Sequence, residues 1–248
     1  LSMAFQQLYN IADSVIAGRF VGKDALAAIG SSFPVTMLFL AVAMGASVGS
    51  SVVISQLFGV KKLAKMKSAI WTSIIAIMAL AALLTVVGLI ICKPIIKLLQ
   101  TPTEIFSSAN TYLYIYIAGL PFLFLYNAAT AIFTGLGDSR TPLYFLIFSS
   151  VFNIALDIVF VTAVKMGVSG VAWATFIAQG ISGVLAMGTL FIRIAKIKND
   201  EKYKKFDFSL LKNIASVAVP SILQQSFISV GQLCVQGLIN SFGTETIA

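Results

Sequence analysis

AIWTSIIAIMALAALLTVVGLIIC, residues 69 to 92, contains no charged side chain and determines the fold class. An α-helix rises about 1.5 Å per residue, so roughly 20 apolar residues cross the hydrocarbon core of a bilayer. This stretch is long enough to do so. A transmembrane β-strand would be about half as long and would alternate in polarity. The stretch therefore predicts a membrane-spanning helix.

Further apolar stretches of similar length lie on both sides of it. They are residues 1–17, 33–58, 112–134, 143–164, 168–194 and 214–242. Hydrophobic residues make up 58% of the chain and charged residues 10%, whereas a soluble domain carries about 25% charged residues. The mean hydropathy is +0.96. One core could not bury this much apolar surface, so we predict an all-α, polytopic transmembrane helical bundle with the lipid bilayer as its solvent.

The net charge of +8 lies in short clusters between the apolar stretches. No basic face interleaved with aromatic residues accompanies it, so we predict no nucleic-acid partner. Twelve of the 17 lysine and arginine residues, Lys67 among them, fall in the loops after the second, fourth and sixth stretches. Loops rich in positive charge stay in the cytoplasm. We therefore predict a multi-pass protein of the cytoplasmic (plasma) membrane.

A short motif near the start of the chain is repeated at its end. FVGKDALA, residues 20–27, is similar to SFGTETIA, residues 241–248. Six apolar stretches separate the two copies, which predicts a duplicated six-helix unit, as many transporters have. We expect an N-terminal six-helix lobe, a cytoplasmic linker and the first helix of a second lobe, the rest of which is missing. Their bounds are residues 1–195, 196–212 and 213–248.

The inventory of reactive side chains is small. The chain has no histidine, and its two cysteines, Cys92 and Cys234, are far apart. Zinc sites, Ser-His-Asp triads and Cys-His nucleophiles are therefore excluded. We expect no cofactor and no enzymatic activity.

One enzyme alternative remains in the sequence. GLGD, residues 135–138, matches the GxGD signature of intramembrane aspartyl proteases, with Asp157 or Asp13 as the second aspartate. Short glycine motifs of this kind match by chance often. Asp138 lies two residues before Arg140 in a predicted turn. This position favours a loop ion pair between the two.

Only two carboxylates, Asp13 and Asp157, fall within apolar stretches, where a charge is costly and usually functional. Each belongs to a row of polar residues spaced for one helix face, and a third row has no acid. The rows are Gln6, Asn10 and Asp13; Ser150, Asn153 and Asp157; and Thr175, Gln179 and Ser182. Because lipid cannot satisfy these groups, we expect the rows to face one another. Their hard oxygens suit Na⁺, and two nearby carboxylates suit H⁺.

Two more features concern the shape and packing of the helices. Pro121 predicts a kink in the fourth stretch, between Tyr112 and Asn127. Such a helix could line a cargo cavity, although a tyrosine of the membrane interface accounts for Tyr112 equally well. Gly45 and Gly49 form a GxxxG motif, which predicts close packing of two helices. The residues expected to line the cargo cavity are Gln6, Asn10, Tyr112, Asn127 and Gln179.

Five motifs, spread over essentially the whole chain, resemble the multidrug and toxic compound extrusion (MATE) family in order and spacing. They are QQLYNIAD (6–13), DALAAIG (24–30), GLGDSRTP (135–142), NIALD (153–157) and GVSGVAWAT (167–175). The resemblance implies two six-helix lobes around a central cavity, and export of small organic cations driven by Na⁺ or H⁺. It also implies a cation site in the N-terminal lobe with a tyrosine, Tyr112, beside it. The matching site residues are Asp13, Asn153, Asp157 and Thr175.

The sequence departs from the family pattern at one place. Some members carry a glutamate midway along the seventh helix for a second site, but residues 224–231 contain no acid here. This favours coupling through the N-terminal lobe. A lipid-linked oligosaccharide flippase of the same superfamily is the alternative, with basic residues in its cavity that meet pyrophosphate. No Lys or Arg lies in the middle of an apolar stretch here, which favours cationic or neutral cargo.

Overall fold

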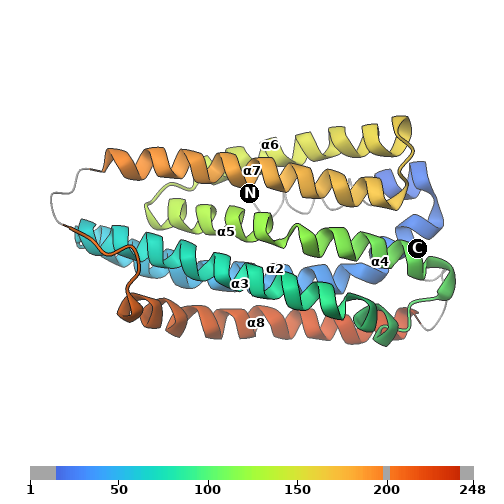
Figure 1. The fold of residues 1–248 in the computed structure, drawn as a ribbon, viewed down its shortest axis with the longest axis horizontal. Coiled ribbons are helices and arrows are strands. Elements are labelled where there is room, and N and C mark those ends of the chain that lie inside the picture. Colours follow the sequence, from blue (N-terminus) through green and yellow to red (C-terminus); the bar gives the residue numbers. More distant parts are fainter. Residues whose placement is uncertain (1–14, 198–201, 241–248) are drawn as a thin grey trace.

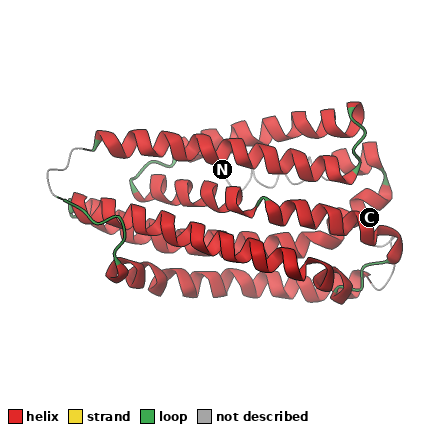
Figure 2. Ribbon diagram, viewed as in Figure 1, coloured by secondary structure: helices red, strands yellow, loops and turns green. Residues whose placement is uncertain are grey.

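The computed structural model describes residues 15–197 and 202–240. These residues form helices and no strand (Figure 2). The elements in order are η1 (Ala17–Val21), α2 (Lys23–Gly59), α3 (Leu63–Leu98), α4 (Thr103–Ala118), α5 (Leu120–Gly135), α6 (Arg140–Ile158), η2 (Val159–Ala163), α7 (Val168–Lys196) and α8 (Phe208–Asn240), where η marks a π-helix. The long helices run side by side along the long axis, with α6 and α7 at one edge and α8 along the opposite edge (Figure 1).

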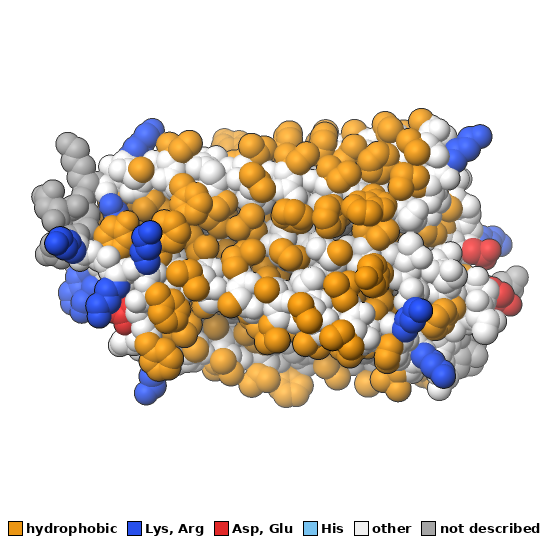
Figure 3. Space-filling model, viewed as in Figure 1, with side chains coloured by type: hydrophobic (Ala, Val, Ile, Leu, Met, Phe, Trp, Pro, Cys, Tyr) orange, Lys and Arg blue, Asp and Glu red, His pale blue; other side chains and the backbone are white. Residues whose placement is uncertain are grey.

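Five of the described helices are long and apolar enough to cross a membrane, and the bent pair α4–α5 makes a sixth. They coincide with six of the seven stretches that the sequence predicts. The first stretch, residues 1–17, lies almost entirely outside the described residues. Figure 3 shows hydrophobic side chains over the middle of the molecule and lysine and arginine toward its two ends. The predicted all-α membrane-spanning bundle is confirmed.

The helices extend beyond the apolar stretches. α2 begins at Lys23 rather than residue 33, and α3 begins at Leu63 rather than residue 69. Asp24 lies in the first turn of α2, where a negative charge interacts favourably with the helix dipole. Lys67, which the apolar pattern assigns to a loop, belongs to α3 and is only 8% exposed. That assignment is wrong because hydropathy marks the part of a helix in lipid and misses its polar ends.

The predicted kink lies between α4 and α5, whose axes differ by 46°. Gly119 separates the two helices, and Pro121 follows in the first turn of α5. Proline has no N–H to donate to the preceding turn, so the helical hydrogen-bond ladder is interrupted there. A side chain at Gly119 would also crowd Phe176 of α7, since a Cβ atom would lie 3.1 Å from that ring.

The GxxxG motif on α2 packs against α8. A Cβ atom on Gly45 would lie 2.6 Å from the backbone of Ile222, and one on Gly49 would lie 2.5 Å from the Ile214 carbonyl oxygen. The two backbones can approach this closely only because both positions lack a side chain. The predicted close helix packing is confirmed, and its partner is the helix that follows the linker.

That linker is shorter than the sequence predicts. α7 ends at Lys196, one residue beyond the predicted bound, and α8 begins at Phe208 rather than at residue 213. The Asp207 carboxylate accepts hydrogen bonds from the backbone N–H groups of Ser209 and Leu210, at 2.9 and 3.4 Å. Asp207 therefore caps the helix, which starts ahead of its continuous apolar run.

Candidate functional site

Three of the predicted cation-site residues come together between α6 and α7. Asn153 and Asp157 lie one turn apart on α6 and are both fully buried, and Thr175 of α7 is 5% exposed. The Asn153 amide nitrogen donates to the Thr175 hydroxyl at 3.4 Å, and that hydroxyl donates to the Val171 carbonyl at 3.1 Å. An amide, a hydroxyl and a carboxylate thus share one buried part of the bundle.

Asp157 stands at an irregular point of its helix. The α-helical part of α6 ends at Ile158, and the chain continues as the π-helix η2, in which the Val164 N–H donates to the Val159 carbonyl. Single π turns inside α-helices are rare and are frequently found at functional sites. A buried ionised carboxylate is also expensive, by several kcal/mol after relaxation. The adjoining π-helix and the cost of its burial both indicate a functional role for Asp157 rather than a role in packing alone.

The other predicted site residues are distributed as follows. Tyr112 is 8% exposed and belongs to a small apolar cluster with Ile16, Val161 and Val171, beside the end of α6. Asn127 and Gln179 lie elsewhere, in a shared cavity. Three predicted residues fall outside the described part of the chain: Gln6, Asn10 and Asp13.

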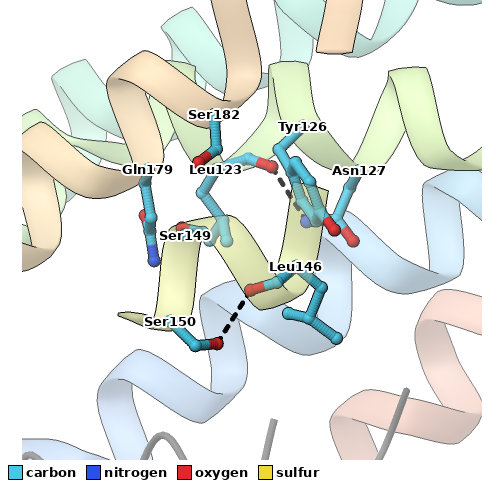
Figure 4. A pocket seen from close by; sticks show the side chains of 8 residues that line it. All are labelled: Leu123, Tyr126, Asn127, Leu146, Ser149, Ser150, Gln179 and Ser182. Atoms are coloured by element: carbon cyan, nitrogen blue, oxygen red, sulfur yellow. Dashed lines mark hydrogen bonds between the residues drawn. The ribbon is translucent and has the colours of Figure 1, made fainter. Parts of the chain in front are cut away.

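The cavity that contains Asn127 and Gln179 has a volume of about 60 Å³. Figure 4 shows side chains from α5, α6 and α7 converging on it. Its lining residues are Leu123, Tyr126, Asn127, Leu146, Ser149, Ser150, Gln179 and Ser182. The space is large enough for water but far smaller than the roughly 300–1,000 Å³ of a drug-sized site.

Some polar side chains of this cavity already form hydrogen bonds with backbone carbonyl groups. The Asn127 amide donates to the Leu123 carbonyl at 2.8 Å, and the Ser150 hydroxyl donates to the Leu146 carbonyl at 2.8 Å. The Ser182 hydroxyl is buried and has no hydrogen-bond partner among the described residues. The described residues therefore leave its hydrogen-bonding capacity unused.

Sequence reasoning missed two polar members of this cavity, Tyr126 and Ser149. The Tyr126 hydroxyl donates to the Pro142 carbonyl at 3.1 Å, and the Ser149 hydroxyl donates to the Ala178 carbonyl at 3.4 Å. Each is the sequence neighbour of a predicted polar residue, and neither lies on the same polar row. Their position next to Asn127 and Ser150 was the available signal.

The cavity and the buried aspartate lie on the same faces of α6 and α7. Ser150 lines the cavity, and Asp157 lies about two turns, or roughly 10 Å, further along α6. On the antiparallel α7, Ser182 and Gln179 line the cavity and Thr175 meets Asn153. Two of the predicted polar rows therefore face each other, and they form a polar seam from the cavity to Asp157.

The GxGD aspartate has a different environment. The Asp138 carboxylate forms an ion pair with Arg193 of α7, accepts hydrogen bonds from the backbone of Arg140 and Thr141, and accepts the Thr141 hydroxyl at 2.7 Å. The expected ion pair with Arg140 is wrong, because that residue contributes only its backbone N–H. Burial opposes ionisation, but the bonds from Thr141 and Arg193 outweigh it and lower the pKa of Asp138.

Comparison with known proteins gives the family. The MatE family model matches residues 1–159. Over its full length the chain is 32% identical to the probable multidrug resistance protein YoeA and 28% identical to the probable multidrug resistance protein YpnP, both of Bacillus subtilis (strain 168). It spans about half the length of these relatives, 55% of each.

Solved structures agree with the sequence relatives. An inward-facing conformation of a multidrug resistance MATE family transporter of the MOP superfamily is 27% identical, with a TM-score of 0.87 over 98% of this chain and 55% of that one. Members of this family are transporters rather than enzymes, so the protease alternative falls, and the flippase alternative is not favoured. The chain belongs to the MatE family, in agreement with the resemblance in its motifs.

Proposed function

We propose that the whole protein is an antiporter that exports organic cations across the cytoplasmic membrane in exchange for Na⁺ or H⁺. The observation that supports this most directly is the fully buried Asp157, which shares its surroundings with Asn153 and Thr175 in a chain of the MatE family. We assign the binding of the coupling ion to these residues together with Asp13. The polar seam leads from them to the cavity of Asn127 and Gln179.

The physical role of the ion follows from the burial of Asp157. An ionised carboxylate is costly in a low-dielectric bundle, and binding of Na⁺ or H⁺ neutralises its charge. A carboxylate, an amide oxygen and a hydroxyl are hard oxygen ligands that suit Na⁺, and the carboxylate alone suits H⁺. Occupancy of the site therefore biases the lobe toward one of two states. The shift is limited by the difference in ion affinity between the states.

The second carboxylate of the proposal, Asp13, precedes the first described residue. Ile16 belongs to the apolar cluster that also contains Tyr112 and Val161, next to the end of α6. Three residues of extended chain span at most about 11 Å, which limits the reach from Ile16 to Asp13. This supports a site built from the first apolar stretch and α6 together, in which the two carboxylates titrate as a unit.

Efflux of ethidium from cells that carry the whole protein tests the proposal. Asp157→Asn keeps the shape of the side chain and removes its charge, so efflux should fall to background while the protein still folds. Asp13→Asn should behave in the same way. Asp138→Asn is the matched control, since it neutralises an aspartate at the end of the bundle, and it should retain most of the activity. Normal efflux in both site variants would contradict the proposal.

A further inference from the structure

A second cavity lies at the end of the bundle where α7 is joined to α8, away from the seam. It has a volume of about 430 Å³ and is bounded by the α2–α3 turn, the start of α3, the segment before α8 and the first turns of α8. We call it the basic pocket, and define it by Lys62, Lys65, Ser68, Lys202, Lys204 and Asp207. Figure 3 shows lysine and arginine side chains gathered at this end of the molecule.

The charge balance of the basic pocket favours an anion. It has four lysines and one acid, Asp207, whose carboxylate already accepts two backbone N–H groups at the start of α8. Within residues 15–197 and 202–240, the one ion pair is that of Arg193 with Asp138. None of the four ammonium groups is therefore neutralised by a carboxylate of the described chain.

Ser68 gives a second, independent indication of a ligand. This residue lines the basic pocket from α3 and is 4% exposed. In the described part of the chain its buried hydroxyl has no hydrogen-bond partner. A buried hydroxyl without a partner is unusual, since most such groups are satisfied by protein or by a bound molecule.

The walls of the basic pocket are fixed by specific contacts. The Lys67 ammonium donates to the Ile197 carbonyl at 2.6 Å, and it lies 5.8 Å from the centre of the Tyr203 ring. The Asp207 N–H donates to the Thr72 hydroxyl at 3.0 Å. These contacts hold the segment that carries Lys202 and Lys204 against α3, so the four lysines surround a defined space.

A further cavity with fewer charged residues adjoins the basic pocket. It has a volume of about 390 Å³ and shares Leu57, Lys62, Leu210 and Asn213 with that pocket. Its remaining lining consists of Val52, Val53 and Gln56 of α2, Val60 of the α2–α3 turn, and Ser216 and Val217 of α8, so four of these six residues are valines. A small anion would use only the basic pocket. A ligand with a negative head and an apolar chain matches both spaces.

We propose that the basic pocket binds the phosphate head of an anionic phospholipid, whose acyl chain enters the adjoining valine-lined cavity. Basic pockets between membrane helices on the cytoplasmic side bind such head groups, and the loop charges place this end of the bundle in the cytoplasm. The lipid bridges α2, α3 and α8, so it joins the N-terminal helices to the helix that follows the linker. None of the ion-site residues proposed above lines this pocket, so the two sites are separate.

Lipid binding can be measured on the whole protein in phosphatidylcholine nanodiscs with increasing phosphatidylglycerol, with native mass spectrometry as the readout. Wild-type protein should retain phosphatidylglycerol in preference to phosphatidylcholine. The variant K62Q/K65Q/K202Q/K204Q should lose that preference by at least about tenfold, because each lysine near the surface adds to the affinity for anionic lipid. Ser68→Ala should weaken retention without changing the net charge.

The matched control is K23Q/K93Q/K97Q/K165Q, which removes the same number of charges at the opposite end of the bundle. It should bind phosphatidylglycerol as the wild type does. Equal retention of the two lipids by the wild-type protein would overturn the proposal without any variant, as would equal losses in both lysine variants. Displacement of the lipid by inorganic phosphate alone would assign the pocket to a small anion instead.

Discussion

At the residue scale, the surroundings of Asp157 and Asp138 differ, and so do the roles that we assign to them. Asp157 is fully buried at one end of the seam, whereas Asp138 lies in a turn and is surrounded by donors. The sequence marks both as unusual, one by its apolar surroundings and the other by a glycine motif. The Arg193 partner of Asp138 is 55 residues away. Only the packing of α7 against the turn brings them together, so a local reading of the motif could not predict it.

The pKa of Asp138 leads to a prediction about pH. Its folded pKa is lowered below the ordinary value of about 3.9, so its contribution to stability is complete above that pH and is lost as the pH falls through the lowered pKa. Asp138→Asn should therefore destabilise the protein at pH 7 by about 1 kcal/mol, since the Arg193 side chain is 42% exposed and screened.

Thermal unfolding of the detergent-solubilised variant at pH 7 measures this loss. The pH profile of ethidium efflux between pH 5 and 8 should keep its shape in Asp138→Asn, because the carboxylate remains ionised over that whole interval. A displaced profile would show that Asp138 titrates during transport, which would contradict its assignment as a structural ion pair.

At the element scale, hydropathy predicts the spans because lipid imposes one length on each of them. Pro121 predicts the kink, since a missing N–H is a local property. The π-helix η2 was not predicted, because the apolar residues from Val159 to Ala163 carry no periodicity that distinguishes it from an α-helix. The start of α8 at Phe208 was missed for a related reason: its first turn depends on the Asp207 cap rather than on hydrophobicity.

The contact of α2 with α8 gives a prediction about helix packing. Gly49→Ala should destabilise the protein, because the new Cβ atom would lie 2.5 Å from the Ile214 carbonyl oxygen and 2.7 Å from the Ala218 Cβ. Overpacking of this kind costs about 1–3 kcal/mol, or it displaces α8. Gly188→Ala on α7 is the control, since its new methyl group would meet no atom within 4 Å. Equal melting temperatures for both variants would show that α8 does not depend on this contact.

At the scale of the whole molecule, the polar rows predicted more of the site than the single residues did. The spacing of Asn153 and Thr175 on their helices is a local property, and the absence of polar partners in lipid makes such rows face inward. Which residues meet across the seam depends on the register of α6 against α7, which no sequence pattern supplies. Tyr112 illustrates this limit, because it lies in the apolar cluster and not in the cavity of Asn127 and Gln179.

The orientation of the whole molecule can be tested through its lysines. Lys165 is exposed between η2 and α7, at one end of the bundle, and Lys202 is exposed at the other end, before α8. The excess of positive charge around Lys202 predicts that this end is cytoplasmic. In whole cells, a membrane-impermeant thiol reagent should label Lys165→Cys and should label Lys202→Cys only after the membrane is opened.

Both variants are made in a background in which the exposed Cys234 is replaced by alanine, whereas Cys92 is 1% exposed and can remain. The reverse labelling pattern would invert the topology, and would place the basic pocket in the outer leaflet.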